Sequence, residues 1–321
     1  MTSRKIAAAA VALAMAAPMA WAVEMEKAIP PYKKIGGVSG GVKAVGSDTL
    51  NNLMSLWAEG FRSVYPAVKV EIEGKGSATA PPALIQGAAS FGPMSREMKR
   101  DEESAFEARY GYKPARVRVA VDALAVYVNK DNPIKSLTLK QLDAIYSRTR
   151  KGGASSEVKT WGDLGLTGSW ASKPVSPYGR NSASGTYAYF KEHALFKGDF
   201  KDTVKEQPGS SAVAQAVAVD KGGIGYSGAG YATPDVRAVP IDGGDGAVEP
   251  TAENAYAGEY PLARYLYVYL NKKPGETLDP LRAEFIKYVL SREGQMSVIK
   301  DGYFPVSASM AGEDRKALGL E

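Results

Sequence analysis

Two strand-like stretches that lie far apart in the sequence constrain the fold most. "VRVAVDALAVYVNK" (117–130) and "RYLYVYLNK" (264–272) are rich in the β-branched and aromatic residues that favour strands. The block between them, near 125–260, is about the size of a domain, and 321 residues suffice for two domains. We therefore expect an α/β fold in which the middle block is inserted into another domain, with two crossover strands acting as a hinge beside a cleft. The alternative is one larger α/β domain with a single cleft.

The segments before the first stretch predict alternating strands and helices. "VKAV" (42–45) and "VKVEIEG" (68–74) have strand composition, and a second helix is expected to start at Pro81-Pro82. The glycine-rich "GGIGYSG" (222–228) lacks the lysine of a nucleotide-binding loop, so we expect a tight turn there. Between the first two strands, apolar residues recur at helical spacing: Leu50, Leu53, Met54, Trp57, Phe61 and Val64.

The N-terminal segment predicts export. In "MTSRKIAAAAVALAMAAPMAWA" (1–22), Arg4 and Lys5 precede an Ala-rich apolar run that closes on a small-residue cleavage site, as in a cleavable signal peptide. The run is short for a membrane anchor. We therefore expect an exported mature protein that is freely soluble.

Composition excludes several classes of site. Zero cysteines exclude disulfides, an N-terminal lipid anchor and thiolate metal ligands, and a net charge of only +5 gives no argument for nucleic acid. The single histidine, His193, lies in "FKEHALFKG", which favours a helix surface over a catalytic base. No catalytic residue, metal site or cofactor is predicted.

Three Gly/Ser/Thr turns each follow a predicted strand and open a predicted helix. They are "GSDTL" (46–50), "GKGSATAPPAL" (74–84) and "GRNSASGTY" (179–187). Helix N-termini present unpaired N–H groups and a positive dipole end, and the Arg180 guanidinium can add a bidentate contact to an oxyanion. Such turns lie at the carboxyl ends of strands, where α/β sheets bind ligands. Turns from two lobes could therefore hold a tetrahedral anion from both sides of the cleft.

These motifs also carry a family resemblance. With "FGPMSREM" (91–98) and "GGIGYSGAGY" (222–231), they resemble in order and spacing the periplasmic phosphate-binding component of the high-affinity phosphate ABC importer, the PstS family, over about residues 36–306. The resemblance implies a two-lobed periplasmic binding protein of type II, with lobe 1 formed by 23–122 and 262–321 and lobe 2 by 123–261. It implies a monomer that binds inorganic phosphate without a cofactor and delivers it to the membrane permease subunits.

The resemblance also implies the site residues. Thr49 and the Leu50 amide match the first contact turn, Ser77 the second, and the remaining matches fall on the third turn. The full set expected to contact phosphate is Ser47, Asp48, Thr49, Leu50, Ser77, Ser95, Arg180, Ser184, Gly185 and Thr186.

The chain departs from the family pattern at two positions. Many members have an aspartate where this chain has Ser95, and such members also have an acid where this chain has Ser182. A carboxylate accepts the proton that phosphate keeps and sulfate lacks, so another acceptor is expected. Asp48 is the hypothesis, with a plain helix cap as its alternative role.

Two further charged residues, Asp122 and Arg96, lie near these motifs. Asp122, which lies near the hinge, is a weaker candidate for the acceptor. Arg96 is either a second cation or a solvated surface charge, and we favour the latter.

Two other functions remain open. An exported phosphate-ester hydrolase would use Ser47, Ser77 or Thr186 as nucleophile, although it would need a base or a metal that the composition does not offer. A binding protein for sulfate or another oxyanion is the second alternative, because of the missing aspartate. A role in adhesion or extracellular phosphate scavenging leaves no mark in the sequence.

Overall fold

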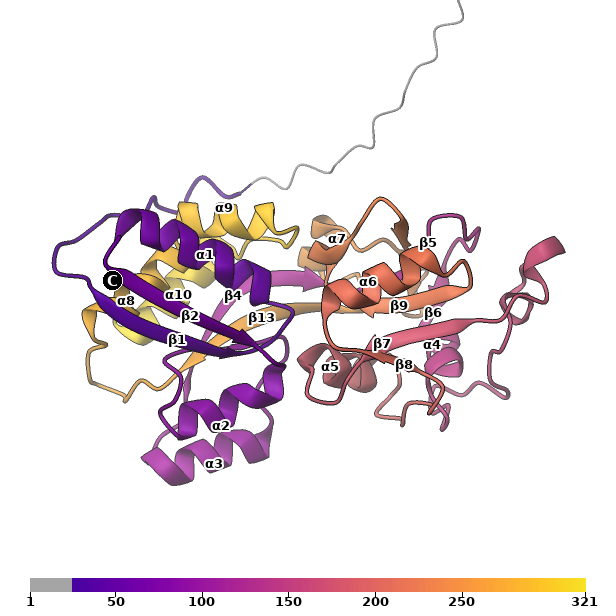
Figure 1. Ribbon diagram of the computed structural model, residues 1–321, viewed down its shortest axis with the longest axis horizontal. Helices are drawn as coiled ribbons and strands as arrows, with labels where there is room; N and C mark the ends of the chain where they lie inside the picture. The colour runs from indigo at the N-terminus through magenta and orange to yellow at the C-terminus, as the bar shows by residue number, and fades with distance from the viewer. Residues whose placement is uncertain (1–24) are drawn as a thin grey trace, which may run out of the picture.

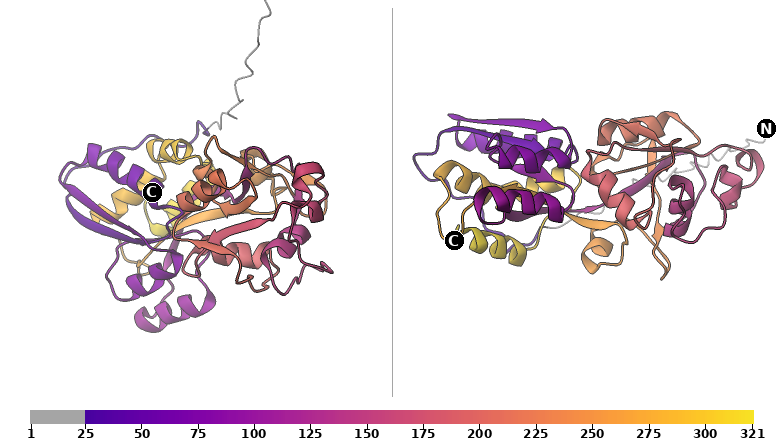
Figure 2. Two further views of the ribbon diagram at one scale, coloured as in Figure 1. Left: turned by 45° about the vertical axis from the view of Figure 1, so that its right-hand side comes forward. Right: turned by 90° about the horizontal axis from the view of Figure 1, so that it is seen from below.

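A computed structural model describes residues 25–321, and the predicted signal peptide (1–22) lies outside the described residues. The chain forms two bodies connected by a narrow waist (Figures 1 and 2). The first body, lobe 1, contains both ends of the described chain, and the second, lobe 2, contains the middle of the sequence. This is the inserted arrangement that the two distant strands predict. None of the helices in this part of the chain is long and apolar enough to cross a membrane.

Lobe 1 is built on a central sheet. Strands β1 and β2 pair in parallel, and β3, β13 and β4 form an antiparallel sheet in that order. A parallel bridge between Ala44 and Phe91, with Val45 N donating to Phe91 O at 3.1 Å, joins the two sheets. The strands are β1 (Gly40–Gly46), β2 (Val68–Gly74), β3 (Gly92–Met94), β4 (Ala115–Ala123) and β13 (Ala263–Leu270).

Helices cover both faces of this sheet. On one face, Leu53, Trp57 and Phe61 of α1 are fully buried, as their helical spacing predicts, and they pack with residues of α8, α9 and α10. On the other face, Leu84 of α2 and Phe106 of α3 pack against the sheet. The helices are α1 (Asn51–Val64), α2 (Ala80–Ile85), α3 (Arg100–Tyr110), α8 (Pro280–Val289), α9 (Arg292–Lys300) and α10 (Ala308–Leu318).

Lobe 2 contains a five-stranded sheet of order β10-β5-β9-β7-β8 and a small sheet of order β12-β11-β6. Helix α6 packs on one face of the larger sheet, and α4 and α5 pack on the other. The strands are β5 (Ala125–Asn129), β6 (Leu137–Thr138), β7 (Ser176–Arg180), β8 (Lys205–Gln207), β9 (Gly223–Ser227), β10 (Val236–Ala238), β11 (Ile241–Asp242) and β12 (Ala247–Val248), and the helices are α4 (Leu139–Tyr146), α5 (Gly185–His193), α6 (Ser210–Val219) and α7 (Ala252–Ala257).

The glycine-rich segment 222–228 is not the tight turn that the sequence suggested. Residues 223–227 form β9, which lies in the middle of the larger sheet. A Cβ on Gly225 would lie 2.6 Å from Val213 Cγ1 of α6. The glycine therefore lets α6 pack directly on the strand, which explains the glycine-rich composition of this segment without a turn.

The two lobes are connected at the ends of β4 and β13. Strand β4 leads into β5 through Leu124, and β13 returns to lobe 1 alongside β4, with Arg264 paired to Asp122 in the register. Each lobe has its own apolar core. The largest cluster draws on 38–120 and 266–320, and the second draws on 121–262 together with Phe304.

Candidate anion-binding site

The three predicted turns meet between the lobes. "GSDTL" connects β1 to α1 and the Ser77 turn connects β2 to α2, both at carboxyl ends of parallel strands, while the third turn connects β7 to α5. Ala78 N donates to Ala183 O at 3.1 Å, so the second and third turns touch. Gly76 has a φ of +112°, and a Cβ there would lie 2.5 Å from Ala183 O. A glycine is therefore required for this approach.

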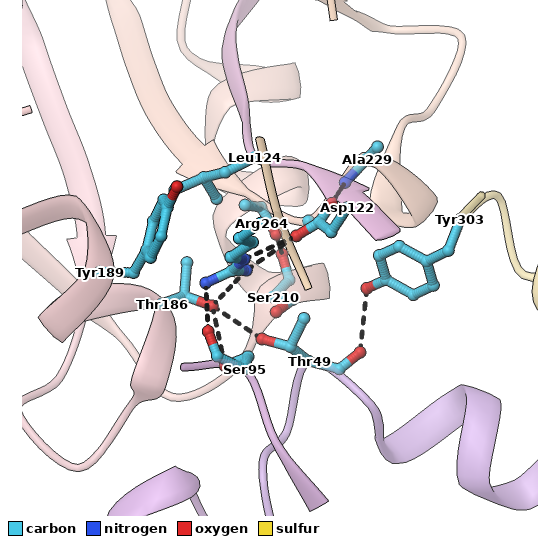
Figure 3. A network of polar contacts seen from close by, with 12 residues as sticks. Thr49, Ser95, Asp122, Leu124, Thr186, Tyr189, Ser210, Ala229, Arg264 and Tyr303 are labelled. Carbon is cyan, nitrogen blue, oxygen red and sulfur yellow. Dashed lines mark hydrogen bonds and ion pairs between the residues drawn. The ribbon is translucent and has the colours of Figure 1, made fainter. Parts of the chain in front are cut away.

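Five hydroxyl side chains form a connected cluster at this meeting point. Thr49 Oγ1 and Thr186 Oγ1 lie 2.8 Å apart, so the cluster crosses from lobe 1 to lobe 2. Ser95 Oγ lies 3.5 Å from Thr186 Oγ1, and it is 3.0 Å from Ser47 Oγ and 3.3 Å from Ser77 Oγ. All five residues are buried. Figure 3 shows Thr49, Ser95 and Thr186 pointing toward one another.

The N-terminus of α5 is directed at this cluster. Ser184 is its N-cap, and its Oγ accepts from Thr186 N at 3.1 Å and from Tyr187 N at 3.3 Å. A Cβ on Gly185 would lie only 2.3 Å from Ser77 Oγ and 2.7 Å from Ser95 Oγ. Gly185 thus brings the helix backbone close to hydroxyls of the opposite lobe, which places the positive end of the helix beside them.

Arg180 ends β7 and is 1% exposed. Its Nη1 donates to Ser210 Oγ at 2.7 Å, and its Nη2 lies 3.3 Å from Asp48 Oδ2. Burial lowers the pKa of Arg180, and the nearby Asp48 carboxylate acts in the opposite direction. Its Nε is buried without a partner among residues 25–321. A desolvated guanidinium of this kind favours an anionic neighbour.

Asp48 does not cap α1, so the alternative role considered for it is wrong. The N-cap of α1 is Leu50, which has a buried side chain and makes no side-chain cap bond. The Asp48 carboxylate reaches across the lobes, where Oδ2 accepts from Ser210 N at 2.8 Å. Asp48 therefore binds the first residue of α6 and the Arg180 guanidinium together.

The sequence analysis missed Arg264, which lies against the hydroxyl cluster. Its Nη2 donates to Thr186 Oγ1 at 3.0 Å and to Asp122 Oδ2 at 2.8 Å, and the residue is 6% exposed. The signal was present in "RYLYVYL", because strand alternation puts Arg264 on the same side as the buried Leu266 and Val268. A charged residue on the buried face of a strand needs a partner.

Arg96 and Ser182, two other residues near the motifs, differ in their exposure to solvent. Arg96, which we expected to be a solvated surface charge, is 8% exposed and pairs with Glu102 through Nη1–Oε2 at 2.7 Å and Nη2–Oε1 at 2.6 Å. The surface interpretation is therefore wrong, because a carboxylate six residues along the chain neutralises the arginine. Ser182 is exposed.

No group of three or more carboxylate or histidine side chains within 25–321 is placed to hold a metal ion. His193 is exposed on α5, where its ring stacks on Tyr189 with centroids 4.0 Å apart, as expected for a surface position.

Comparisons with known proteins establish the family. A family model described as a PBP superfamily domain matches residues 33–293. Phosphate-binding protein PstS of Pseudomonas aeruginosa is 57% identical over 298 residues, which cover 92% of this chain and 92% of that protein. The chain belongs to the PstS family. A PstS of Staphylococcus epidermidis is 30% identical and aligns with 80% of this chain and 77% of its own length.

A solved structure supports the same assignment. A Clostridium perfringens protein, assigned as a phosphate ABC transporter substrate-binding protein and crystallised with bound phosphate, is 29% identical with a TM-score of 0.71. The match covers 84% of this chain and all of that one. The predicted fold, a two-lobed α/β periplasmic binding protein, is confirmed. The hydroxyl of Ser95, the position where the family resemblance led us to look for a carboxylate, belongs to the hydroxyl cluster.

Proposed function

We propose that this PstS-family protein binds inorganic phosphate between its lobes and delivers it to the membrane permease of an ABC importer. The observation that carries the proposal is the buried hydroxyl cluster of both lobes, which lies at the N-terminus of α5. A buried oxyanion must exchange its hydration for fixed donors, and hydroxyls, helix amides and a guanidinium supply them. The relatives named PstS support the same ligand.

The proposed phosphate contacts come from both lobes. Arg180 supplies the charge-assisted contact, and α5 supplies backbone N–H groups and the Thr186 hydroxyl. Lobe 1 supplies hydroxyls and the Leu50 amide at the start of α1. The contact set is Ser47, Asp48, Thr49, Leu50, Ser77, Ser95, Arg180, Ser184, Gly185 and Thr186.

Asp48 is the proposed acceptor for the proton of phosphate. Its Oδ2 already accepts from Ser210 N and faces Arg180, so Oδ1 is the oxygen left for a phosphate hydroxyl. Asp122 is the poorer acceptor, since Oδ1 accepts from Ala229 N at 2.9 Å and Oδ2 accepts from Arg264. Selection of phosphate over sulfate is thereby proposed to rest on Asp48 in place of the missing aspartate.

The cellular setting follows from the same proposal. Export through cleavage after residue 22 would place the mature protein in the periplasm, as a monomer that meets the permease subunits of the importer. We place lobe 1 at 23–122 and 262–321 and lobe 2 at 123–261. The division of the apolar cores near residues 121 and 262 supports these boundaries.

The protein is a solute-binding protein and not a hydrolase. Its family consists of substrate-binding components, and the hydroxyls considered as nucleophiles contact other hydroxyls of the cluster or an arginine. In the described chain, neither a histidine nor a metal group lies beside them to act as a base.

Isothermal titration calorimetry of the ligand-stripped mature protein (23–321) tests the proposal, with phosphate, sulfate, arsenate and a phosphonate titrated separately at neutral pH. Tight one-to-one binding of phosphate with no heat from sulfate is expected. If sulfate binds as tightly as phosphate, the protein is instead a binding protein for sulfate or another oxyanion. Phosphate release from a chromogenic ester, together with no anion binding, would instead support the phosphate-ester hydrolase alternative.

A further inference from the structure

Arg264 and Asp122 form a buried ion pair at the hinge. The two residues are register partners in β13 and β4, and their side chains are 2% and 0% exposed. Arg264 Nε and Nη2 both donate to Asp122 Oδ2, at 3.0 and 2.8 Å. Asp122 Oδ1 accepts from Ala229 N of lobe 2. Burying such a pair costs desolvation that its mutual attraction barely repays, so stability alone is a weak reason for it.

The rest of the guanidinium faces the hydroxyl cluster (Figure 3). Nη2 donates to Thr186 Oγ1 of lobe 2, and Nη1 donates to Ser95 O of lobe 1 at 2.8 Å. The Tyr189 ring covers the guanidinium, with its centroid 5.2 Å from Cζ. An arginine has five N–H donors, and these contacts use four of them. The fifth, on Nη1, has no partner among the described residues and is available to a ligand.

Arg264 also determines how the hydroxyl hydrogens point. A guanidinium cannot accept a hydrogen bond, so Thr186 Oγ1 accepts from Arg264, and its own hydrogen can be donated to Thr49 Oγ1 or to a bound anion. Ser77 Oγ accepts from Ser95 N at 3.0 Å, and its hydrogen can likewise be donated to Ser95 Oγ or to a bound anion. Several donors thus converge on one point between the lobes, as an oxyanion requires.

We propose that Arg264 is a second cationic contact for the bound phosphate and that Asp122 is the positioning residue that holds it. This inference rests on the proposed function. Arg180 and Arg264 are each matched by one carboxylate, Asp48 and Asp122, so the four side chains present two guanidiniums with little surplus charge. Without either guanidinium its carboxylate would face the ligand uncompensated, so each guanidinium favours the phosphate dianion over the monoanion.

Phosphate titration of Arg264→Gln, Arg264→Lys and Arg118→Gln in the mature protein tests the proposal. Losing one charge-assisted contact weakens binding by roughly 10- to 100-fold in Arg264→Gln, and Arg264→Lys should fall between it and wild type. Arg118 is the matched control, because it lies on β4, the partner strand of β13, and its partly buried side chain pairs with Asp314 of α10 at 2.9 Å. Arg118→Gln should bind phosphate as wild type does.

A pH series separates a direct contact from a structural role. Between about pH 6 and pH 8, inorganic phosphate gains its second charge, so wild-type affinity should rise over this range. The rise should be smaller in Arg264→Gln, because the lost cation no longer favours the dianion. A purely structural loss would weaken binding equally at both pH values, and that result would overturn the proposal.

A double-mutant cycle tests the part assigned to Asp122. If Asp122 acts through Arg264, Asp122→Asn weakens phosphate binding alone but adds nothing to Arg264→Gln. The double variant removes both buried charges, so it remains informative even where Asp122→Asn alone folds poorly.

Three outcomes separate this inference from the proposed function. Tight phosphate binding by wild type with an unchanged affinity in Arg264→Gln refutes the role of Arg264 and leaves the function intact. Tight sulfate binding that is lost in Arg264→Gln keeps Arg264 as an anion contact and rejects the phosphate assignment. A wild-type protein that binds none of these anions overturns both.

Discussion

Replacing Gly185 by alanine should block the approach of the lobes without harming either lobe. The new Cβ would lie 2.3 Å from Ser77 Oγ and 2.9 Å from Ser77 Cβ, whereas ordinary contact begins at 3.4 Å. One of the two segments must therefore move by about 1 Å. Ser77 has little freedom to move, because the neighbouring Ala78 N is bonded to Ala183 O across the cleft.

The expected cost can be worked from this overlap. Overpacking of a tight site costs about 1–3 kcal/mol, which weakens phosphate binding by roughly 5- to 150-fold. Alanine is a better helix former than glycine, so the stability of the ligand-free protein should stay the same or rise slightly. The combination of weaker binding with undiminished stability is the signature of a block between the lobes.

Calorimetric titration with phosphate, paired with thermal unfolding of the ligand-free protein, measures both effects. Gly312→Ala is the matched control, since it makes the same change inside α10, where the new Cβ meets no atom within 4 Å. An affinity of Gly185→Ala within about twofold of wild type would show that α5 does not approach Ser77 this closely when phosphate binds.

Two further predictions concern carboxylates. Asp48→Asn should lower the preference for phosphate over sulfate by about tenfold, because an amide can donate to either anion, and an unchanged preference in competition titrations would reject the acceptor assignment. Burial raises the pKa of Asp301 from 3.8 to about 6. Folding therefore favours its protonated form, and its contribution to stability, present at low pH, is lost as the pH rises from about 4 to about 6, by on the order of 2 kcal/mol. Urea unfolding across this range should show the loss in wild type but not in Asp301→Asn, and equal slopes for both would contradict the assignment.

Local patterns predicted much of the fold. The spacing from Leu53 to Phe61 fixes the buried face of α1, and the strand composition of 68–74 matches β2. The two distant strands predicted the inserted lobe, because a chain that leaves a domain and returns to it needs two connections. The turns that open α1 and α5 can be recognised from the sequence, because Gly, Ser and Thr cap helix N-termini and let an anion approach the free N–H groups there.

What the sequence could not predict depends on contacts between distant residues. Arg264 was read as part of a strand, since its partners Asp122 and Thr186 lie far away in the sequence. The cap role of Asp48 was plausible locally, but its carboxylate binds Ser210 of the other lobe. The sequence alone favours a surface position for Arg96, because only the packing of α3 brings the Glu102 carboxylate beside its guanidinium.

The chemistry of the cleft contacts has a consequence for the release of cargo. Thr49–Thr186, Asp48–Ser210 and Ala78–Ala183 join the lobes through hydroxyl, carboxylate and backbone groups and not through apolar side chains. Water can replace each of these partners, so breaking these three contacts exposes little apolar surface and carries only a small change in heat capacity. In the proposed transport cycle, a membrane partner that favours the open form would therefore need only modest binding energy to break them.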